Sequence, residues 1–384
     1  MARPLPGVNH RVLVWARQRS GQSVDDVAAA LKKDPGVVAG WERGEGSPTY
    51  VQLEKLAYSV YKRPMALFFF PEPPDEPDPE HSFRTLPDFE LENLSADTRY
   101  KVRKARAFQL ALGELNDGRN PSERLIFRAI PLAPQADVVT SASDVRAYLR
   151  VPLATQMGWS DPSQALERWR AALEDVGIYA FKDSFKQKDV SGFSLTDDTF
   201  PIIYINNSTA FTRQTFTLFH ELAHILLNES GVTKRDDRYI SSLSGDARNV
   251  EVFCNRFASE FLVPGAVFRE LTERRAHSDD LVFGLAQRFG VSREVILRKF
   301  LEARKISAEF YRQKVREWAE ESEARGGREG GGNYYLTQGA YLGQRYLRLA
   351  FGRYYQGRCT REQLADYLNV KASSLGGLEP HGAG

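Results

Sequence analysis

The chain has 384 residues, with 52 Lys and Arg against 50 Asp and Glu, so its net charge is only +2. This length predicts two or three domains, and the balanced charge means that nucleic-acid binding would need a local basic patch. The two cysteines, Cys254 and Cys359, lie far apart and have no Cys-x-x-Cys spacing. This pattern argues against a disulfide framework and for a reducing compartment.

The first six residues, Met-Ala-Arg-Pro-Leu-Pro, lack the apolar run of a signal peptide. No stretch reaches the ~18 consecutive apolar residues of a membrane span. We therefore expect a cytoplasmic protein that makes no membrane contact. The helical and strand patterns along the chain predict an α+β fold that is mainly α.

Residues 1–70 predict short helices joined by tight turns. Ser23 caps one of these helices, with Asp25 and Asp26 in its first turn. With Trp-Glu-Arg-Gly at 41–44 and Leu-x-x-Leu-Ala at 53–57, the segment resembles the Xre/Cro-type helix-turn-helix family. The resemblance implies a five-helix domain whose third helix enters the DNA major groove.

The presumed recognition helix departs from that family. Residues 34–40, Asp-Pro-Gly-Val-Val-Ala-Gly, offer almost no side chain that reaches a base edge. Val24 stands where the family often has a phosphate-contacting glutamine. Residues 1–70 contain 10 Lys and Arg and 6 Asp and Glu, a net +4 that suits only modest phosphate binding. Operator recognition and a degenerate module for protein contacts or dimerisation both remain open.

Two linkers are predicted from composition. Residues 71–80 are a proline-rich acidic stretch that should be stiff and extended, and residues 326–332 are rich in glycine. A long basic helix is expected from Ser95 to about Asp117, with a solvated charged face rather than a groove for an acidic partner. The predicted organisation is a helix-turn-helix domain at 1–70, a linker at 71–80, a central domain at 81–325, a linker at 326–332 and a helical Arg/Tyr-rich segment at 333–384.

Three apolar runs rich in β-branched and aromatic residues predict short strands at 177–181, 190–195 and 200–206. Together they suggest a small sheet whose edge lies along a cleft, where a peptide can be held as an added strand. Pro201 marks the third run as an edge strand or as the start of a strand.

The next stretch, residues 219–227, reads Phe-His-Glu-Leu-Ala-His-Ile-Leu-Leu. On a helix, His220 and His224 project from one face, and two such imidazoles can bind one tetrahedral zinc. Glu221 is then placed to take a proton from a metal-bound water. The alternative is a pair of core histidines beside a surface glutamate. A buried Glu221 would be costly without a metal or a catalytic role.

A catalytic zinc needs a third protein ligand and an open position. On the helix expected at 247–262, Glu251 and Asn255 are adjacent on one side. We assign Glu251 as the third ligand and give Asn255 the role of orienting a ligand imidazole. Glu260 is a weaker alternative ligand. The further candidates are Cys254, more simply a small buried apolar residue, and His10, His81, His277 and His381. For an oxyanion donor, the guesses are His277 and Tyr239.

Several spaced elements carry a closer resemblance. Residues 213–224, Arg-Gln-Thr-Phe-Thr-Leu-Phe-His-Glu-Leu-Ala-His, precede a Glu-x-x-x-Asn-x-Phe-Ala-x-x-Phe-Leu-x-Pro pattern at 251–264. With Val-Ser-Gly-Phe at 190–193 and Pro-Ile-Ile-x-x-Asn at 201–206, roughly residues 81–305 resemble the ImmA/IrrE family of metallopeptidases. That resemblance implies a gluzincin-like zinc endopeptidase. The family's ligands fall on His220, His224 and Glu251, and its catalytic glutamate falls on Glu221.

Such proteins typically cleave a transcriptional repressor and so derepress stress-response or mobile-element genes, while others are antitoxins or regulators beside a toxin. Our hypothesis is a zinc-dependent regulatory endopeptidase with a protein substrate and possible DNA contacts through residues 1–70. The alternative is a DNA-binding regulator or antitoxin that binds a partner, such as a cognate toxin, without proteolysis. The interleaved Arg and Tyr of residues 333–384 suit nucleic acid or a protein interface. A helix, a Gly turn and a Ser-capped helix are expected in 279–300, in a packing role.

Overall fold

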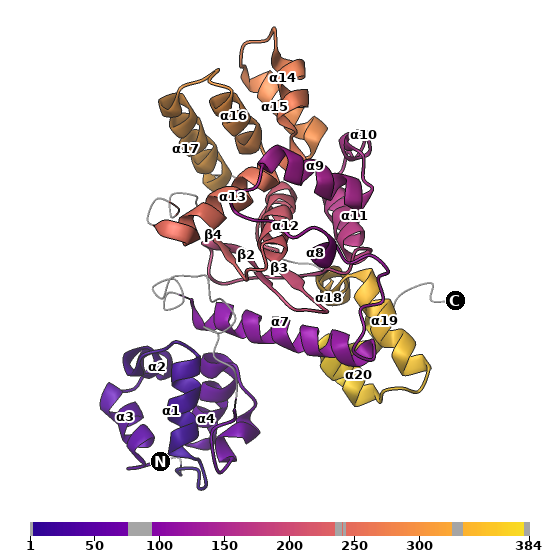
Figure 1. Cartoon of the computed structure of the whole chain (residues 1–384). Coiled ribbons are helices and arrows are strands. Elements are labelled where there is room, and N and C mark those ends of the chain that lie inside the picture. The colour runs from indigo at the N-terminus through magenta and orange to yellow at the C-terminus, as the bar shows by residue number, and fades with distance from the viewer. Residues whose placement is uncertain (1–2, 76–93, 235–239, 241–242, 325–332, 380–384) are drawn as a thin grey trace. The chain divides into compact units, whose positions relative to one another are not determined.

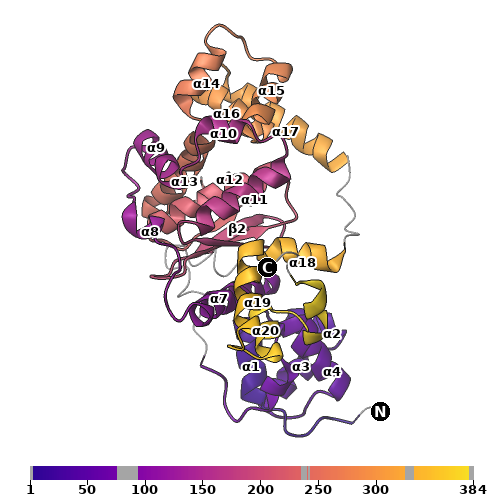
Figure 2. The ribbon, with the colours of Figure 1, turned by 90° about the vertical axis from the view of Figure 1, so that its right-hand side faces the viewer.

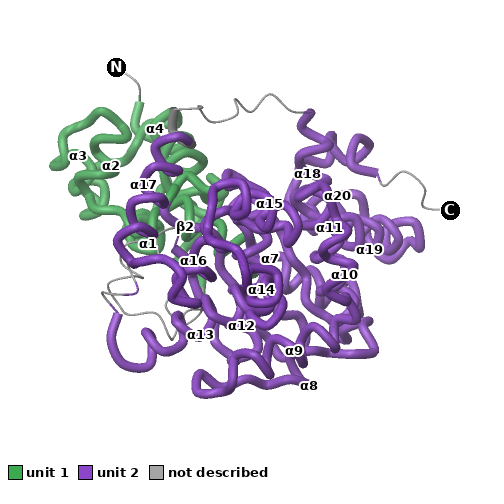
Figure 3. The backbone as a smooth tube through the Cα atoms, turned by 90° about the horizontal axis from the view of Figure 1, so that it is seen from above, with its two compact units in different colours: residues 1–106, 185–188 green, residues 107–184, 189–384 purple. Residues whose placement is uncertain are grey.

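The computed structural model describes residues 3–75, 94–234, 240, 243–324 and 333–379 (Figure 1). The chain forms two compact units, residues 1–106 with 185–188 and residues 107–184 with 189–384 (Figure 3). Within the described ranges, no helix is long and apolar enough to cross a membrane. The stretches 326–332 and 76–80, and the residues His81, Tyr239 and His381, lie outside the described residues. The predicted domain boundaries therefore stay predictions.

The first unit begins with the predicted short helices. They are α1 (His10–Arg19), α2 (Val24–Leu31), α3 (Pro35–Arg43) and α4 (Tyr50–Lys55), followed by a π-helical turn, η1 (Leu56–Tyr61), and a 3-10 turn, η2 (Met65–Phe69). Ser23 caps α2 as predicted, and Asp26 completes a capping box. Arg17 of α1 binds both carboxylate oxygens of Glu42 of α3, at 2.7 and 3.0 Å. Helix α3 turns Trp41 into the core and leaves Val37 exposed.

The second unit is built on a four-stranded mixed sheet. Its strands are β1 (Tyr179–Asp183), β2 (Val190–Leu195), β3 (Ile202–Asn206) and β4 (Val232–Lys234), in the order β1-β3-β2-β4. Strand β1 runs parallel to β3, and the other pairs are antiparallel. The three predicted strands are confirmed, whereas β4 was not predicted. Pro201 directly precedes β3, which lies inside the sheet, so the interpretation as a strand start is right and the edge-strand alternative is wrong.

One face of the sheet is covered by α12 (Phe211–Leu226), with α11 (Pro162–Glu174) and α13 (Gly245–Leu262) packed against that helix (Figures 1 and 2). Leu218 and Leu222 of α12 share a fully buried core with Ile203 and Ile205 of β3. Because α12 touches the sheet and two helices, almost every side chain from Gln214 onward is buried. This position explains the uniformly apolar sequence around the two histidines.

The opposite face of the sheet is covered by the second half of α7 (Ala96–Leu115) and by α19 (Gln344–Tyr355). Phe108 of α7 stacks on Phe181 of β1, with ring centroids 4.5 Å apart. Tyr346 of α19 meets the same Phe181 edge-on at 5.1 Å and is fully buried. The C-terminal segment therefore has a packing role. Helix α7 confirms the predicted long helix, but Arg99 and Lys101 are each only 8% exposed, so the expected solvated charged face is wrong at these positions.

The remaining described elements are helical. They are α8 (Ile126–Ala129), α9 (Val138–Leu149), α10 (Leu153–Met157), α14 (Gly265–Thr272), α15 (Asp279–Phe289), α16 (Arg293–Glu302), α17 (Ala308–Ala324), α18 (Tyr334–Leu342), α20 (Arg361–Leu368) and η4 (Ala372–Gly377). Gly290, in the left-handed region, ends α15, and Ser292 caps α16 as predicted. The predicted mainly helical α+β class is confirmed.

Candidate metal centre

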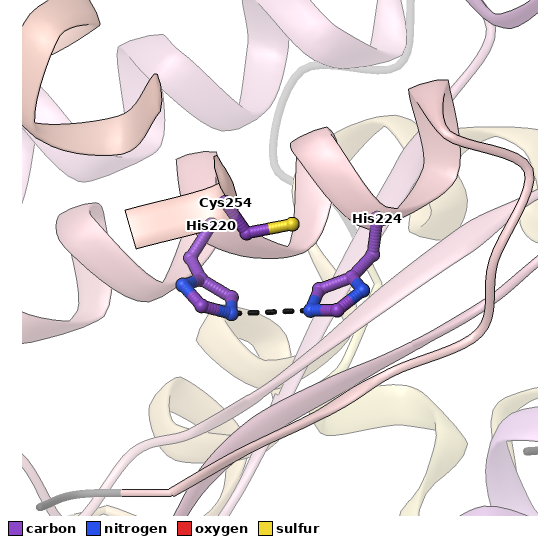
Figure 4. Close-up of side chains that lie close together, drawn as sticks. All are labelled: His220, His224 and Cys254. Carbon is purple, nitrogen blue, oxygen red and sulfur yellow. Dashed lines mark hydrogen bonds between the residues drawn. The ribbon is translucent and has the colours of Figure 1, made fainter. Parts of the chain in front are cut away.

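Helix α12 holds His220, Glu221 and His224 in the interior, at 1%, 0% and 1% exposed. The two histidines lie one turn apart on the same face, and their Nε2 atoms are 3.1 Å from each other. Figure 4 shows the two rings with these nitrogens facing one another. The alternative that placed Glu221 on the surface is therefore wrong.

Helix α13 crosses α12 and brings the predicted third donor to this pair. The carboxylate of Glu251 reaches Nε2 of His220 at 3.3 Å through Oε2 and Nε2 of His224 at 3.2 Å through Oε1. Oδ1 of Asn255, one turn further along α13, lies 2.9 Å from Nδ1 of His220. Since an amide oxygen only accepts hydrogen bonds, Nδ1 carries the proton, and Nε2 of His220 keeps its lone pair for a ligand.

The spacing of these donors fits a tetrahedral ion. Zinc binds nitrogen and carboxylate oxygen at ~2.0–2.2 Å, so two donors on a tetrahedral ion are about 3.3 Å apart. The two histidine Nε2 atoms are 3.1 Å apart, and the Glu251 oxygens lie 3.2 Å from Nε2 of His224 and 3.3 Å from Nε2 of His220. Burial would raise the pKa of Glu251, but its contacts with the two histidines hold that pKa below the ordinary value. A lowered pKa favours the ionised form of the Glu251 carboxylate.

Cys254, also on α13, lies beside the histidines (Figure 4). Its sulfur and a ring nitrogen of each histidine all lie within 4.8 Å of one another. Burial raises the pKa of the Cys254 thiol to about 11, so the thiol keeps its proton at neutral pH, whereas a metal-bound cysteine is a thiolate. The sequence predicts a small buried apolar residue at Cys254. Its position three residues after Glu251, on a neighbouring part of the same helix face, was the signal that it would lie near the site.

Glu221 points to the sheet side of α12. Thr233 of β4 donates a hydrogen bond to Oε1 of this carboxylate, while Oε2 has no hydrogen-bond partner among the described residues. Burial raises the pKa of Glu221 above its ordinary value. A buried carboxylate with a raised pKa is suited to accept and return a proton near neutral pH. Neither Thr233 nor its strand was found from the sequence, where only a short Gly-Val-Thr run marks it.

Gly231 is a second residue that the sequence analysis missed. It precedes β4, and a Cβ added at this position would lie 2.7–2.8 Å from atoms of the His224 ring. Glycine is therefore required for the imidazole to lie flat against the backbone here. Nδ1 of His224 has no hydrogen-bond partner within the described ranges.

Two other candidates from the sequence lie away from this cluster. Glu260 pairs with Lys299 at 2.7 Å and accepts from the backbone N–H of Gly265 at 2.8 Å, so it is wrong as an alternative third ligand. His277 is exposed and rests its ring against Phe310, at 4.8 Å between centroids, away from the buried cluster. The other guess for an oxyanion donor, Tyr239, lies outside the described residues.

A comparison with protein families matches the part of the chain that contains this cluster. A comparison with curated proteins found no match. Residues 173–301, from the end of α11 into α16, match a peptidase family model described as the IrrE N-terminal-like domain. The matched range contains α12, α13 and β4, and with them every residue of the cluster. This region of the chain is therefore similar to metallopeptidase domains of the IrrE/ImmA type.

Proposed function

We propose that the chain is a zinc-dependent endopeptidase that cleaves a regulatory protein. The observation that carries the proposal is the buried set of His220, His224 and Glu251, whose donor atoms have the separations of zinc ligands. Glu221 lies between the two histidines in sequence and is fully buried. Burying this carboxylate would be costly without a role in binding or catalysis.

Each residue then has a separate task. His220, His224 and Glu251 hold the metal, and Asn255 fixes the orientation of His220. Zinc bound there would polarise the scissile carbonyl and lower the pKa of a water towards ~7. Glu221 accepts a proton from that water and passes it to the amine that leaves. Thr233 donates to Oε1 of Glu221 and so leaves Oε2 as the oxygen that takes the proton.

The regulatory part of the proposal rests on resemblance. Residues 1–70 resemble an Xre/Cro-type helix-turn-helix domain, and ImmA/IrrE relatives typically act on transcriptional repressors. We infer that the substrate is a repressor or a similar regulator, and that its cleavage controls stress-response or mobile-element genes. DNA binding by residues 1–70 belongs to the same proposal, and the net charge of +4 in that segment supports only modest affinity.

Cys254 favours a second candidate function. If the thiol lost its proton to a bound metal, four protein donors would surround the ion, as in structural zinc sites. No position would remain for water or substrate. The chain would then act by binding a partner, such as DNA or a toxin, without cutting it.

A substrate trap separates the two functions. We expect Glu221→Gln to keep one zinc per chain, because the metal ligands are intact, and to lower cleavage by at least about 100-fold, because the proton acceptor is lost. Tagged Glu221→Gln should retain an intact regulator that mass spectrometry identifies and that wild type cuts when the two are mixed. Full cleavage by Glu221→Gln would contradict the mechanism. A partner that stays intact with zinc-loaded wild type would instead favour the second function.

A further inference from the structure

A cleft of about 750 Å³ lies in the second unit, away from the buried histidines. One wall is the turn that follows α10, and the opposite wall is the end of α15 with the start of α16. The volume is within the range of about 300–1,000 Å³ that is typical of small-molecule sites. None of the proposed metal ligands lines this cleft.

The polar groups of the cleft favour a negatively charged ligand. Its described lining contains Arg288 and Arg293, the hydroxyls of Ser160 and Thr212, and no Asp or Glu. Arg288 is exposed and makes no hydrogen bond or ion pair with any described residue. The guanidinium of Arg293 lies 4.6 Å from the ring of Trp318 and pairs with Glu321 at 3.3 Å, so its charge is already partly balanced. Arginine binds carboxylates and phosphates through two parallel hydrogen bonds, so a free Arg288 is suited to an anion.

The apolar part of the cleft contains two aromatic rings beside the aliphatic side chains of Met157, Pro162, Ala286 and Val291. Phe283 lines it and is 52% exposed. Trp159 lines it as well. Its ring is held edge-on against Trp169 at 5.0 Å between centroids, and the guanidinium of Arg168 lies over one of its faces at 5.5 Å, which leaves the other face for a ligand. Aromatic faces of this kind bind another planar ring by stacking.

The two walls are held together by a buried side chain. Gln156 of α10 is 2% exposed, and its amide donates to the carbonyls of Leu262, at 2.9 Å, and of Phe289, at 2.8 Å. Arg146 in turn donates to the Oε1 of Gln156 at 2.7 Å. With these hydrogen bonds the cleft is formed before a ligand arrives, which lowers the free-energy cost of binding.

We propose that this cleft binds a small anion that carries a planar ring and has about the size of a nucleotide. Arg288 contacts the anionic group, and Phe283 and Trp159 contact the ring. Thr212, the second residue of α12, also lines the cleft. The ligand would therefore touch the beginning of the helix that carries His220 and His224. This binding does not depend on the proposed peptidase activity.

Calorimetric titration of the full-length chain with AMP, adenosine and inorganic phosphate tests the proposal. Fluorescence titration with 1-anilinonaphthalene-8-sulfonate is a second test. AMP and the sulfonate each combine a ring with an anion, so we expect both to bind. Adenosine and phosphate each have only one of these parts and should bind at least about tenfold more weakly than AMP. Arg288→Gln should weaken AMP by about tenfold or more, because a charge-assisted hydrogen bond is lost.

Two further variants complete the test. Gly284 lines the cleft, and nothing lies within 4 Å of a Cβ added there, so Gly284→Leu should fill the space and abolish binding while the chain stays folded. Arg348→Gln, an exposed arginine of α19 outside the cleft, should leave the affinity unchanged. The proposal is overturned if neither AMP nor the sulfonate binds, if Arg288→Gln binds AMP as wild type does, or if adenosine or phosphate alone matches AMP.

Discussion

Oδ1 of Asn255 lies 2.9 Å from Nδ1 of His220, on the side of the ring away from His224 and Glu251. This contact fixes the tautomer of His220, because the amide oxygen requires the proton on Nδ1. Asn255→Ala removes the acceptor, and we expect zinc affinity to fall by about 10–100-fold. Competition with a chelator of known affinity measures the loss. Asn255→Asp keeps an acceptor oxygen and should retain most of the affinity, and unchanged binding in Asn255→Ala would contradict this role.

The thiol of Cys254 decides whether a metal at this site has three or four protein donors. His220, His224 and Glu251 already supply three donors that lie 3.1, 3.2 and 3.3 Å from one another, so we expect Cys254→Ala to keep both the bound zinc and the peptidase activity within about twofold of wild type, as for a buried residue that acts only in packing. X-ray absorption of the zinc-loaded wild type should then show nitrogen and oxygen neighbours alone. A zinc–sulfur distance of ~2.3 Å in wild type that is absent from Cys254→Ala would contradict this expectation. It would mean that four protein donors surround the metal and leave no position for water.

Gly231 sets how closely the backbone approaches His224. In Gly231→Ala the new Cβ would lie 2.7 Å from ring atoms of His224, so either the imidazole or the strand must move. We expect weaker zinc binding by about tenfold or more, since a ligand displaced by a few tenths of an ångström no longer fits the tetrahedral geometry. Gly113→Ala, in α7, is the matched control because open space surrounds that position. Equal zinc affinity in both variants would remove this role from Gly231.

Glu174 of α11 gives the fold a pH dependence that is separate from the metal centre. Burial raises its pKa from 4.5 to about 7, although Arg170 and Arg345 favour the charged form. Glu167 and Asp175 add to the rise. At a pH between the unfolded pKa of 4.5 and the folded pKa of about 7, the unfolded chain binds fewer protons than the folded chain. The free energy of unfolding therefore falls as pH rises through this range.

Urea unfolding at pH 5 and pH 8 measures this effect. In Glu174→Gln the carboxyl is replaced by a neutral group of similar size, and we expect the fall in stability between these pH values to become smaller. Asp144→Asn, at an exposed carboxylate of α9 that does not act on Glu174, serves as the control and should keep the wild-type pH dependence. If the free energy of unfolding falls between pH 5 and pH 8 by the same amount in Glu174→Gln as in wild type, the carboxyl of Glu174 stays charged in the fold.

Local features of the fold and site were predictable because their causes are local. Ser23 and Thr360 cap their helices through contacts within three residues, and the placement of His220 beside His224 follows from helical periodicity. Glu251 was found because its neighbour Asn255 shares its helix face. The helix of Glu251 and the helix of the histidines could be anticipated, but not the angle at which they cross.

What the sequence did not reveal depends on contacts between distant parts of the chain. Strand β4 has only three residues, and it exists because β2 offers it an edge, so its own composition carried almost no signal. Thr233 and Gly231 gained their roles with that strand. The packing of Tyr346 against Phe181 joins residues more than 160 positions apart, and no local pattern could indicate it.

The edge-on contact between Trp159 and Trp169 continues inward, since Trp169 meets Phe219 at 4.8 Å and an angle of 88°. Phe219 directly precedes His220. Because the two indoles are in contact, a movement of either ring changes the asymmetric surroundings of the other, and the near-ultraviolet circular dichroism band of the pair should respond. One member lines the cleft, and the other packs beside the histidine helix. The protein thus carries a built-in, label-free optical reporter, in which events at the cleft and at the helix change the same band.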